Sequence, residues 1–502
     1  MPRGRIVLCL MLARLAGAGL TWPADARLAL AQQAAAPATT SANSATATKP
    51  DAHDDAAAPE PPLSPEQALA AFGTDPGLRV ELVAAEPLID SPVALAFDAR
   101  GRMYVVENRG YPTGPETAGR IALLEDTDAD GTFDRRTEFA EGLSFPNGLM
   151  PWRDGLLVTC APDLIYLADT DGDGHSDRRE VLLTGFSTAG STQLRASHPQ
   201  LGLDNWIYVT GGLTGGKVTS PKNPDHPVVE FGRADFRFLP DCSQFEAIDG
   251  GGQFGMTFDD FGHRFICYNR VQVQHVVLPG RYLRRNKHLA ARGTVQDCPA
   301  DMVAEPLAGH GASARLYPIS KNITTADSHA GTFTAACGVM VFRSSGLPAA
   351  YRGGVFSCDP TGNLVHFDTL QPAGATFVAR RSKDESEFLA SRDDWFRPVN
   401  LAQGPDGALY VCDMYRKTIE HPDYLPPEIR KHTDFESGKG MGRIWRVRRA
   451  DMSEVDLFNS RMVSPNELAN PFGLCSEDSW RRDTTHRLLL ESRDPKRLPR
   501  LK

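Results

Sequence analysis

The sequence lacks the features that mark several large classes of protein. After the N-terminal region it has no run of about 18 consecutive apolar residues, so we expect no transmembrane span in the mature chain. It has no CxxC or CxxCH motif, which excludes a thioredoxin-type site and a covalent c-type haem site in this chain. P-loop, dinucleotide-binding, nucleophile-elbow and HExxH motifs are also missing. The formal net charge of −9 argues against a nucleic-acid partner, because phosphate-binding domains are usually basic.

The N-terminal region predicts export. Residues 1–31 have the order of a signal peptide: early arginines, an apolar stretch, and a small-residue cleavage pattern at Ala29-Leu30-Ala31. Residues 32–62 are rich in Ala, Thr, Pro and Asp and predict a disordered linker. We therefore expect an exported protein, located in the periplasm or at the cell surface.

The cysteine content leaves two alternatives open. Cleavage after Ala31 removes one of the nine cysteines and leaves an even number. An even number in an exported chain permits disulfides, although the sequence does not choose among the pairings. The alternative is that several cysteines are small buried residues on strands. The eight remaining cysteines are Cys160, Cys242, Cys267, Cys298, Cys337, Cys358, Cys412 and Cys475.

A short pattern recurs from Leu63 onward: an apolar residue, a turn with Gly, Asp or Asn, and an apolar or aromatic strand. A period of about 50 residues is typical of repeat folds, and it suits the four short strands of one propeller blade. Residues 63–450 are therefore predicted to be an all-β, six-bladed β-propeller. The alternative is a β-sandwich with unrelated hairpins, which would not keep the period. The turn centres are Gly101, Gly155, Asn205, Gly262, Gly353 and Gly407.

Two segments depart from the repeat. The fourth and fifth turns are further apart than the others, which predicts an insertion of loops at about 279–335. After residue 450 the spacing of apolar residues becomes helical, notably in the stretch that begins at Trp480. Residues 451–502 therefore predict a short C-terminal helical extension.

Two acidic loops predict calcium sites. The first places Asp126, Asp128, Asp130 and Asp134 at positions 1, 3, 5 and 9, with glycine at position 6. Calcium is bound by several oxygen ligands, and the glycine permits the sharp turn that gathers them. Because strand-like segments flank the loops, we expect structural strand–loop–strand cages; the alternative is a plain Asp/Gly turn. The second loop has the same pattern in Asp169, Asp171, Asp173 and Asp177, and adds Glu180 at position 12.

Polar residues near the predicted innermost strands are candidates for a site at the propeller's mouth. A histidine can act as a general base toward a hydroxyl, since its pKa lies near neutrality. An arginine can hold carboxylate or quinone oxygens by paired hydrogen bonds. Each is also a common structural hydrogen-bonding partner. The candidates include His198, Asn269, Arg270, Arg397 and Asp413.

From about residue 69 to 448 the chain resembles a known family. The segments SPVALAFDARGRMYVVENRGYP, GGQFGMTFDDFGHRFICYNRVQVQHVVLP, WFRPVNLAQGPDGALYVCDMYR and GMGRIWRV resemble the propeller of soluble quinoprotein glucose/sorbosone dehydrogenases. The resemblance is greater to multidomain "membrane-bound dehydrogenase" proteins, in which HEAT-type helical repeats and often a cytochrome c domain follow the propeller. The stretch from Trp480 resembles the opening of that helical part.

The resemblance implies a dehydrogenase that uses pyrroloquinoline quinone (PQQ) to oxidise a sugar or alcohol and passes electrons to a separate cytochrome c. It implies His198 as catalytic base and Arg397 as a clamp for cofactor or substrate. The chain departs from the family pattern where Val399 replaces a second arginine and Gly251-Gly252 replace an Arg-Asn pair. A second hypothesis is therefore a non-catalytic, calcium-stabilised propeller that binds carbohydrate or a protein partner.

Overall fold

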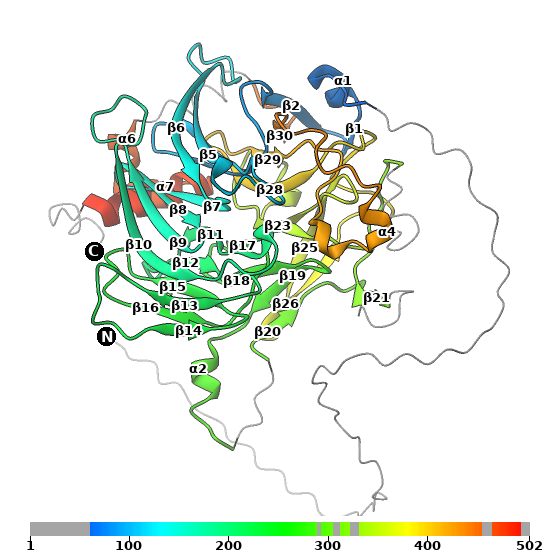
Figure 1. Cartoon of the computed structure of the whole chain (residues 1–502). Coiled ribbons are helices and arrows are strands. Elements are labelled where there is room, and N and C mark those ends of the chain that lie inside the picture. The colour runs from blue at the N-terminus through cyan, green and yellow to red at the C-terminus, as the bar shows by residue number, and fades with distance from the viewer. Residues whose placement is uncertain (1–60, 289–292, 305–311, 322–330, 454–463, 493–502) are drawn as a thin grey trace, which may run out of the picture. The chain divides into compact units, whose positions relative to one another are not determined.

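The computed structural model describes residues 61–288, 293–304, 312–321, 331–453 and 464–492. The predicted signal peptide and nearly all of the predicted linker lie outside these ranges. Antiparallel sheets follow one another along the described chain and form the six-bladed β-propeller that the repeat predicts (Figure 1).

In blades 1 to 3 the first strand along the chain is innermost, and two strands from within the sequence of blade 3 extend blade 2. Blade 1 consists of β3 (Pro92–Phe97), β4 (Met103–Glu107), β5 (Gly119–Glu125) and β6 (Arg135–Leu143). Blade 2 consists of β7 (Gly148–Trp152), β8 (Gly155–Cys160), β9 (Asp163–Ala168) and β10 (Arg178–Phe186), extended by β13 (Gly216–Thr219) and β14 (Val229–Phe231). Blade 3 consists of β11 (Ser197–Leu201), β12 (Ile207–Thr210), β15 (Asp235–Phe238) and β16 (Phe245–Ile248).

Blades 4 to 6 follow the same plan. Blade 4 consists of β17 (Met256–Phe258), β18 (Arg264–Tyr268), β19 (Val271–Val276) and β20 (Val295–Asp297). Blade 5 consists of β23 (Cys337–Val341), β24 (Val355–Asp359), β25 (Leu364–Ala373), β26 (Thr376–Arg381) and β27 (Leu389–Ser391), with β1 (Phe72–Thr74) at its edge. Blade 6 consists of β28 (Pro398–Gln403), β29 (Leu409–Asp413) and β30 (Arg443–Arg449), completed by β2 (Leu78–Ala85).

An N-terminal strand closes the ring. The strand β2 pairs with β30 from Leu78 opposite Arg449 to Ala85 opposite Arg443, and blue β2 lies beside orange β30 in Figure 1. The innermost strands contact their neighbours, with β28 against β3 and β3 against β7. Closure removes a free sheet edge at the junction of the two chain ends.

The repeated turn occupies the same place in every blade, between the first and second strands. These positions need backbone angles that favour Gly or Asn, because most of them have positive φ. In blade 2 the left-handed residue is Arg153, at φ 52°. In the other blades it is Gly101 (78°), Asn205 (66°), Gly262 (81°), Gly353 (80°) and Gly407 (73°).

The predicted insertion is only partly loop, because it supplies β20, the fourth strand of blade 4. All eight cysteines of the described ranges are free of disulfides, and seven of them are buried. The remaining short elements are α1 (Pro65–Ala70), η1 (Glu116–Ala118), η2 (Thr192–Leu194), α2 (Gly280–Leu283), β21 (Val303–Ala304), β22 (Ala312–Ser313), η3 (Ala349–Tyr351), η4 (Pro422–Tyr424) and α4 (Pro427–Arg430).

The C-terminal segment is helical, as predicted, and packs on one end of the propeller. It contains α6 (Pro465–Leu468), η5 (Pro471–Cys475) and α7 (Ser479–Ser492). Ser479 Oγ donates to Gln403 Oε1 of blade 6 at 2.8 Å, and His486 Nε2 lies 2.8 Å from Asn205 Oδ1 of blade 3. The helix α7 thus crosses the end where the repeated turns lie. None of the described helices has the length and apolar character needed to cross a membrane.

Candidate functional site

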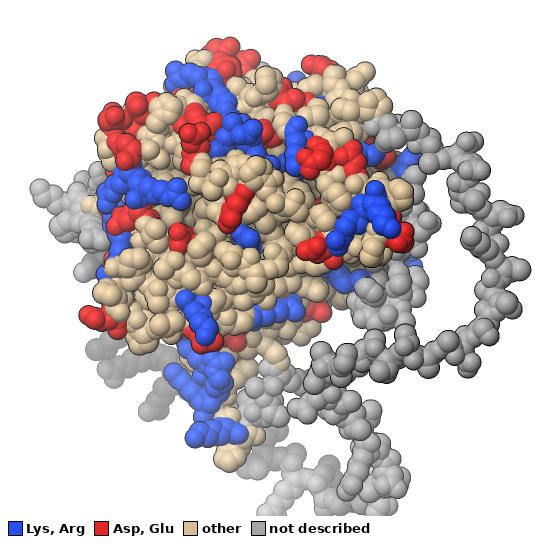
Figure 2. All heavy atoms as spheres, viewed as in Figure 1, with Lys and Arg blue, Asp and Glu red and all other residues tan. Residues whose placement is uncertain are grey.

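A cavity of about 330 Å³, here called the mouth pocket, opens at the end of the propeller away from α7. Most of the lining residues lie just before the first strand or just after the second strand of a blade, and a few, such as Val93 and Val399, lie within these strands. All six blades therefore contribute. Figure 2 shows one face of the molecule, on which charged side chains lie mostly toward the edge. The lining includes Val93, Asn108, Tyr111, Asn147, Gln193, Leu194, Leu213, Gln253, Phe254, Tyr268, Asn269, Thr334, Pro360, Val399, Met414, Ile419, Glu420 and Tyr424.

Side-chain amides dominate the polar lining of the mouth pocket. Asn147 Nδ2 donates to the carbonyl oxygen of Thr192 at 2.8 Å, and Tyr111 donates to Gln193 Oε1 at 2.6 Å. Asn108 Nδ2 donates to Asn147 Oδ1 at 3.3 Å, while Asn108 Oδ1 is buried without a hydrogen-bond partner among the described residues. An amide both donates and accepts, so this lining suits a ligand with many hydroxyl groups.

Glu420 supplies a carboxyl group to the mouth pocket. It lies in residues 414–442, a long excursion between β29 and β30 that carries η4 and α4. Burial raises the pKa of Glu420, although the amide N–H of His421 donates to Glu420 Oε1 at 2.8 Å. The same burial, with the nearby Glu420 charge, raises the pKa of Tyr111 well above its usual value. Glu420 was not among the residues predicted from the sequence; the available signal was the unusual length of the segment between the last two strands.

His198 lies in a different cavity, which we call the α7 chamber. This space of about 270 Å³ lies between the innermost strands and α7. His198 Nδ1 shares a 2.8 Å hydrogen bond with Ser197 Oγ, and Nε2 lies 3.3 Å from Asn400 Oδ1. Its ring packs edge-on against Phe254, which lines the mouth pocket. Burial lowers the pKa of His198 to about 4, so the imidazole is neutral at pH 7.

Arg397 is buried, and its guanidinium binds backbone carbonyl oxygens of separate segments. Its guanidinium donates to the carbonyl oxygens of Arg416 at 3.0 Å and Pro360 at 2.7 Å, and also to that of Lys417. Burial lowers the pKa of Arg397 to about 10. The side chain therefore lies behind the pocket wall that Pro360 forms.

Asp413 also binds mainly backbone groups, in blade 6. Its carboxylate accepts hydrogen bonds from the backbone N–H of Arg397 at 2.8 Å, from that of Tyr415 at 2.9 Å, and from Trp445 Nε1 at 2.9 Å. Burial raises the pKa of Asp413 to about 7. These contacts fix the end of β29.

Asn269 and Arg270 occupy the turn between β18 and β19. Asn269 lines the mouth pocket, and its carbonyl oxygen accepts from the N–H of Ala336 at 2.9 Å. The carbonyl oxygen of Arg270 accepts from Ser313 Oγ at 2.8 Å, and burial lowers the pKa of its guanidinium. Of the candidates predicted for the mouth, the structure thus brings Asn269 into the pocket and places His198 in the other chamber.

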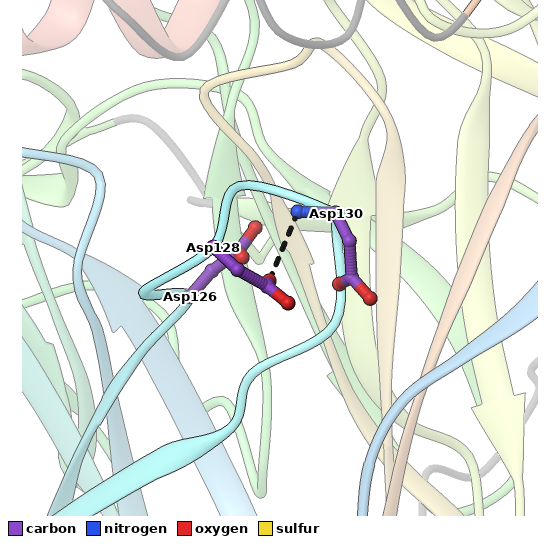
Figure 3. Close-up of side chains that lie close together, drawn as sticks. All are labelled: Asp126, Asp128 and Asp130. Carbon is purple, nitrogen blue, oxygen red and sulfur yellow. Dashed lines mark hydrogen bonds between the residues drawn. The ribbon is translucent and has the colours of Figure 1, made fainter.

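The two acidic loops are equivalent hairpin loops of neighbouring blades. The first joins β5 to β6, and the carboxylates of Asp126, Asp128 and Asp130 each offer an oxygen within 4.8 Å of the others (Figure 3). The N–H of Asp130 donates to Asp128 Oδ1 at 3.3 Å, and that of Gly131 donates to Asp126 Oδ2 at 2.9 Å. Asp134 stays outside the trio and accepts from Thr127 Oγ1 at 2.7 Å.

The second loop joins β9 to β10 and repeats these contacts. Asp169, Asp171 and Asp173 form the equivalent trio, and Asp177 accepts from Thr170. Glu180 instead pairs with Lys222 at 2.6 Å and Arg178 at 3.2 Å. Clustered carboxylate oxygens are the ligands that a hard cation such as Ca²⁺ prefers.

The fold and the pocket define a six-bladed propeller with one ligand-sized cavity at its mouth. A family model described as "Domain of unknown function (DUF7133)" matches residues 64–451, and the chain belongs to this family. A search of curated proteins finds no match.

Several solved structures resemble the chain. One is a glucose dehydrogenase-type oxidoreductase from Thermus thermophilus, with 17% identity and a TM-score of 0.42, covering 74% of this chain and 100% of that one. The PQQ domain of pyranose dehydrogenase from Coprinopsis cinerea has 13% identity and a TM-score of 0.41, with 75% and 97% covered. The PQQ-bound aldose sugar dehydrogenase from Streptomyces coelicolor has 12% identity and a TM-score of 0.38, with 75% and 100% covered.

The mouth pocket does not offer the groups that PQQ needs. This quinone carries several carboxylates, which proteins usually bind through arginine or lysine. Among the described residues, none that lines the mouth pocket is an arginine or lysine. The nearby Arg397 and Arg416 donate instead to backbone carbonyls and to Ser91 Oγ.

Proposed function

We propose that the protein binds a saccharide in the mouth pocket. The observation that carries this proposal is the lining itself: five side-chain amides and three tyrosines surround one carboxyl group in a cavity of about 330 Å³. Binding pockets of this size use a few placed polar groups to fix the orientation of a ligand. Amides suit sugar hydroxyls, because each amide donates and accepts hydrogen bonds.

Oxidation of the bound sugar is a second candidate function, which the position of Glu420 favours. Oxidation of a hydroxyl requires a base for its proton and an acceptor for the hydride of the same carbon, which an added redox cofactor would supply. A carboxyl with a raised pKa is suited to the role of the base. Glu420 lines the mouth pocket and has such a pKa, whereas His198 lies in the α7 chamber. We therefore place Glu420 in the role that the family resemblance assigns to His198. PQQ and a separate cytochrome c stay predictions of that resemblance.

We also propose that calcium binds the two acidic loops and stiffens blades 1 and 2. The support is the matching trio of carboxylates in each loop. Export to the periplasm or cell surface is a further proposal, supported by the sequence pattern of residues 1–31.

Calorimetric titration of the purified chain with neutral mono- and disaccharides tests the binding proposal. Gln193→Ala and Tyr111→Phe should each weaken binding by about tenfold, because each removes part of one pocket hydrogen-bonding pair. Gln371→Ala, an exposed change on β25, should leave the affinity unchanged. Equal affinity in all four proteins, or no sugar binding at all, would contradict the proposal.

A parallel titration with PQQ, followed by a dye-linked assay on sugars, tests the second candidate. Turnover that is lost in Glu420→Gln would support oxidation with Glu420 as base. PQQ binding and turnover that survive this substitution would remove Glu420 from that role.

A further inference from the structure

Glu420 brings a negative charge to the mouth pocket. None of the described residues that line this pocket is a lysine, an arginine or a histidine. Within the described part of the chain, the carboxyl of Glu420 accepts one hydrogen bond, from the N–H of His421 at 2.8 Å, and forms no ion pair. Burial raises the pKa of Glu420. The carboxyl is therefore partly removed from water without a cation to compensate its charge.

Other carboxyl groups away from water have more partners than Glu420. Glu81 pairs with Arg446 at 2.6 Å and with Arg448 at 2.7 Å. Burial acts to raise the pKa of Glu81, but the two arginines bring it below its usual value. Asp413 accepts three hydrogen bonds. A ligand in the mouth pocket can supply the cation that the protein does not place beside Glu420.

Two tyrosines that line the mouth pocket interact with Glu420. Tyr111 follows β4 of blade 1, and Tyr424 lies in η4 on the same excursion as Glu420. Burial raises the pKa of both tyrosine hydroxyls, and the charge of Glu420 adds to this effect in each case. The three side chains therefore lie close enough to interact electrostatically. Since the face of a tyrosine ring attracts cations, a cation beside Glu420 has favourable neighbours in these rings.

The cations at the start of the excursion interact with other groups. Arg416 is fully buried, and its guanidinium donates to the carbonyl oxygen of Tyr111 at 2.6 Å and to Ser91 Oγ at 2.7 Å. The ammonium of Lys417 lies over the ring of Trp395, 5.9 Å from its centroid. Neither side chain lines the mouth pocket. The protein's own cations therefore leave the pocket side of this region to a ligand.

We propose that Glu420, Tyr111 and Tyr424 form a subsite for the ammonium group of an amino sugar. An ammonium carries three donors and no acceptor, so it suits a carboxylate flanked by tyrosines, while the pocket amides bind the sugar hydroxyls. This inference rests on the proposed binding of a saccharide in the mouth pocket and adds the class of sugar. In this role Glu420 binds the ligand, whereas the second candidate function uses it as a base.

Calorimetric titrations at pH 7 with glucose, glucosamine and N-acetylglucosamine test the subsite. The wild-type chain should bind glucosamine about tenfold more tightly than glucose. N-acetylglucosamine, whose nitrogen is uncharged, should bind no more tightly than glucose. Added sodium chloride should weaken the binding of glucosamine more than that of glucose, because salt screens an ion pair. Glu420→Gln should remove the preference for glucosamine over glucose.

Glu428→Gln is the matched control, because Glu428 lies in α4 of the same excursion with a side chain that is 83% exposed, and the preference should persist in this variant. If Glu420→Gln does not fold, the salt dependence of the wild type decides. Equal binding of glucose and glucosamine in the wild type, or a preference that persists in Glu420→Gln, overturns the subsite and leaves saccharide binding in place. If none of the three sugars binds, the proposed function fails as well.

Discussion

Glu420 should make the free energy of unfolding depend on pH. Its pKa is raised in the folded protein, so the folded state binds this proton more tightly than the unfolded chain does. The free energy of unfolding therefore falls as the pH rises from the usual carboxyl pKa through the folded value. Glu420→Gln should be more stable than the wild type at pH 7, and the difference should shrink at pH 4.

Denaturant unfolding of both proteins at the two pH values measures this effect. Glu428→Gln is the matched control, because Glu428 lies on the same excursion with a side chain that is 83% exposed. An unchanged difference between pH 4 and pH 7 would show that Glu420 titrates normally.

Arg397 was a candidate for binding a ligand, but its buried guanidinium is bound to backbone oxygens, so we expect it to stabilise the fold. Arg397→Gln leaves the carbonyl oxygens of Arg416, Pro360 and Lys417 without their shared donor. We expect a loss of about 2–5 kcal/mol in the free energy of unfolding, measured with urea. Loss of ligand binding with unchanged stability would instead indicate a direct role at the pocket.

At the scale of elements, the neighbouring blades 1 and 2 carry equivalent acidic loops, each with three clustered carboxylates. Each trio of carboxylates should attract Ca²⁺, and binding should stabilise the folded state by about 2.7 kcal/mol at 100 times the Kd. We expect EDTA to lower the Tm and Ca²⁺ to restore it. Thermal unfolding with and without the metal measures the effect.

Asp130→Asn and Asp173→Asn separate the charge from the turn. Each replacement keeps an oxygen that can accept from the N–H of Thr132 or His175, but removes one charge from its trio. Both variants should respond less to Ca²⁺. The exposed control Asp384→Asn should respond to Ca²⁺ like the wild type. If EDTA does not change the Tm of the wild type, the loops are turns that bind no calcium.

At the scale of the whole molecule, β2 joins the two ends of the propeller. A chain that begins at Pro87 lacks β2 and exposes the edge of β30, whereas a chain that begins at Gly77 keeps the pairing. We expect cooperative thermal unfolding in the longer chain and its loss in the shorter one, because closure couples blade 6 to blade 1. Calorimetry and gel filtration compare the two chains, and equal cooperativity would show that the ring is stable without β2.

Much of the architecture could be predicted from local pattern. The turn between the first and second strands needs a residue that tolerates positive φ, so Gly101, Gly262 and Gly407 recur at near-regular spacing. The acidic loops could also be located, since all their candidate ligands lie within one short segment. The helix predicted after residue 450 is present as α7, although its apolar residues are not gathered on one face.

The composition of the mouth pocket could not be predicted in this way. Its lining residues come from all six blades, and no short motif distinguishes Gln193 or Glu420 from other polar loop residues. His198 lies at the start of an innermost strand, and Arg397 directly precedes one. The pattern did not indicate at which end of the propeller each side chain lies, or whether it is already bound to backbone groups.

The sequence by itself determined the number of blades, the positions of their turns and the two acidic loops, because these depend on neighbouring residues and backbone angles. Only the tertiary structure decided which polar groups meet in the mouth pocket and which form hydrogen bonds to the backbone elsewhere. The reason is that burial and hydrogen-bond partners depend on contacts between distant segments. These contacts place His198 and Asn269 in different cavities and bind the guanidinium of Arg397 to backbone oxygens.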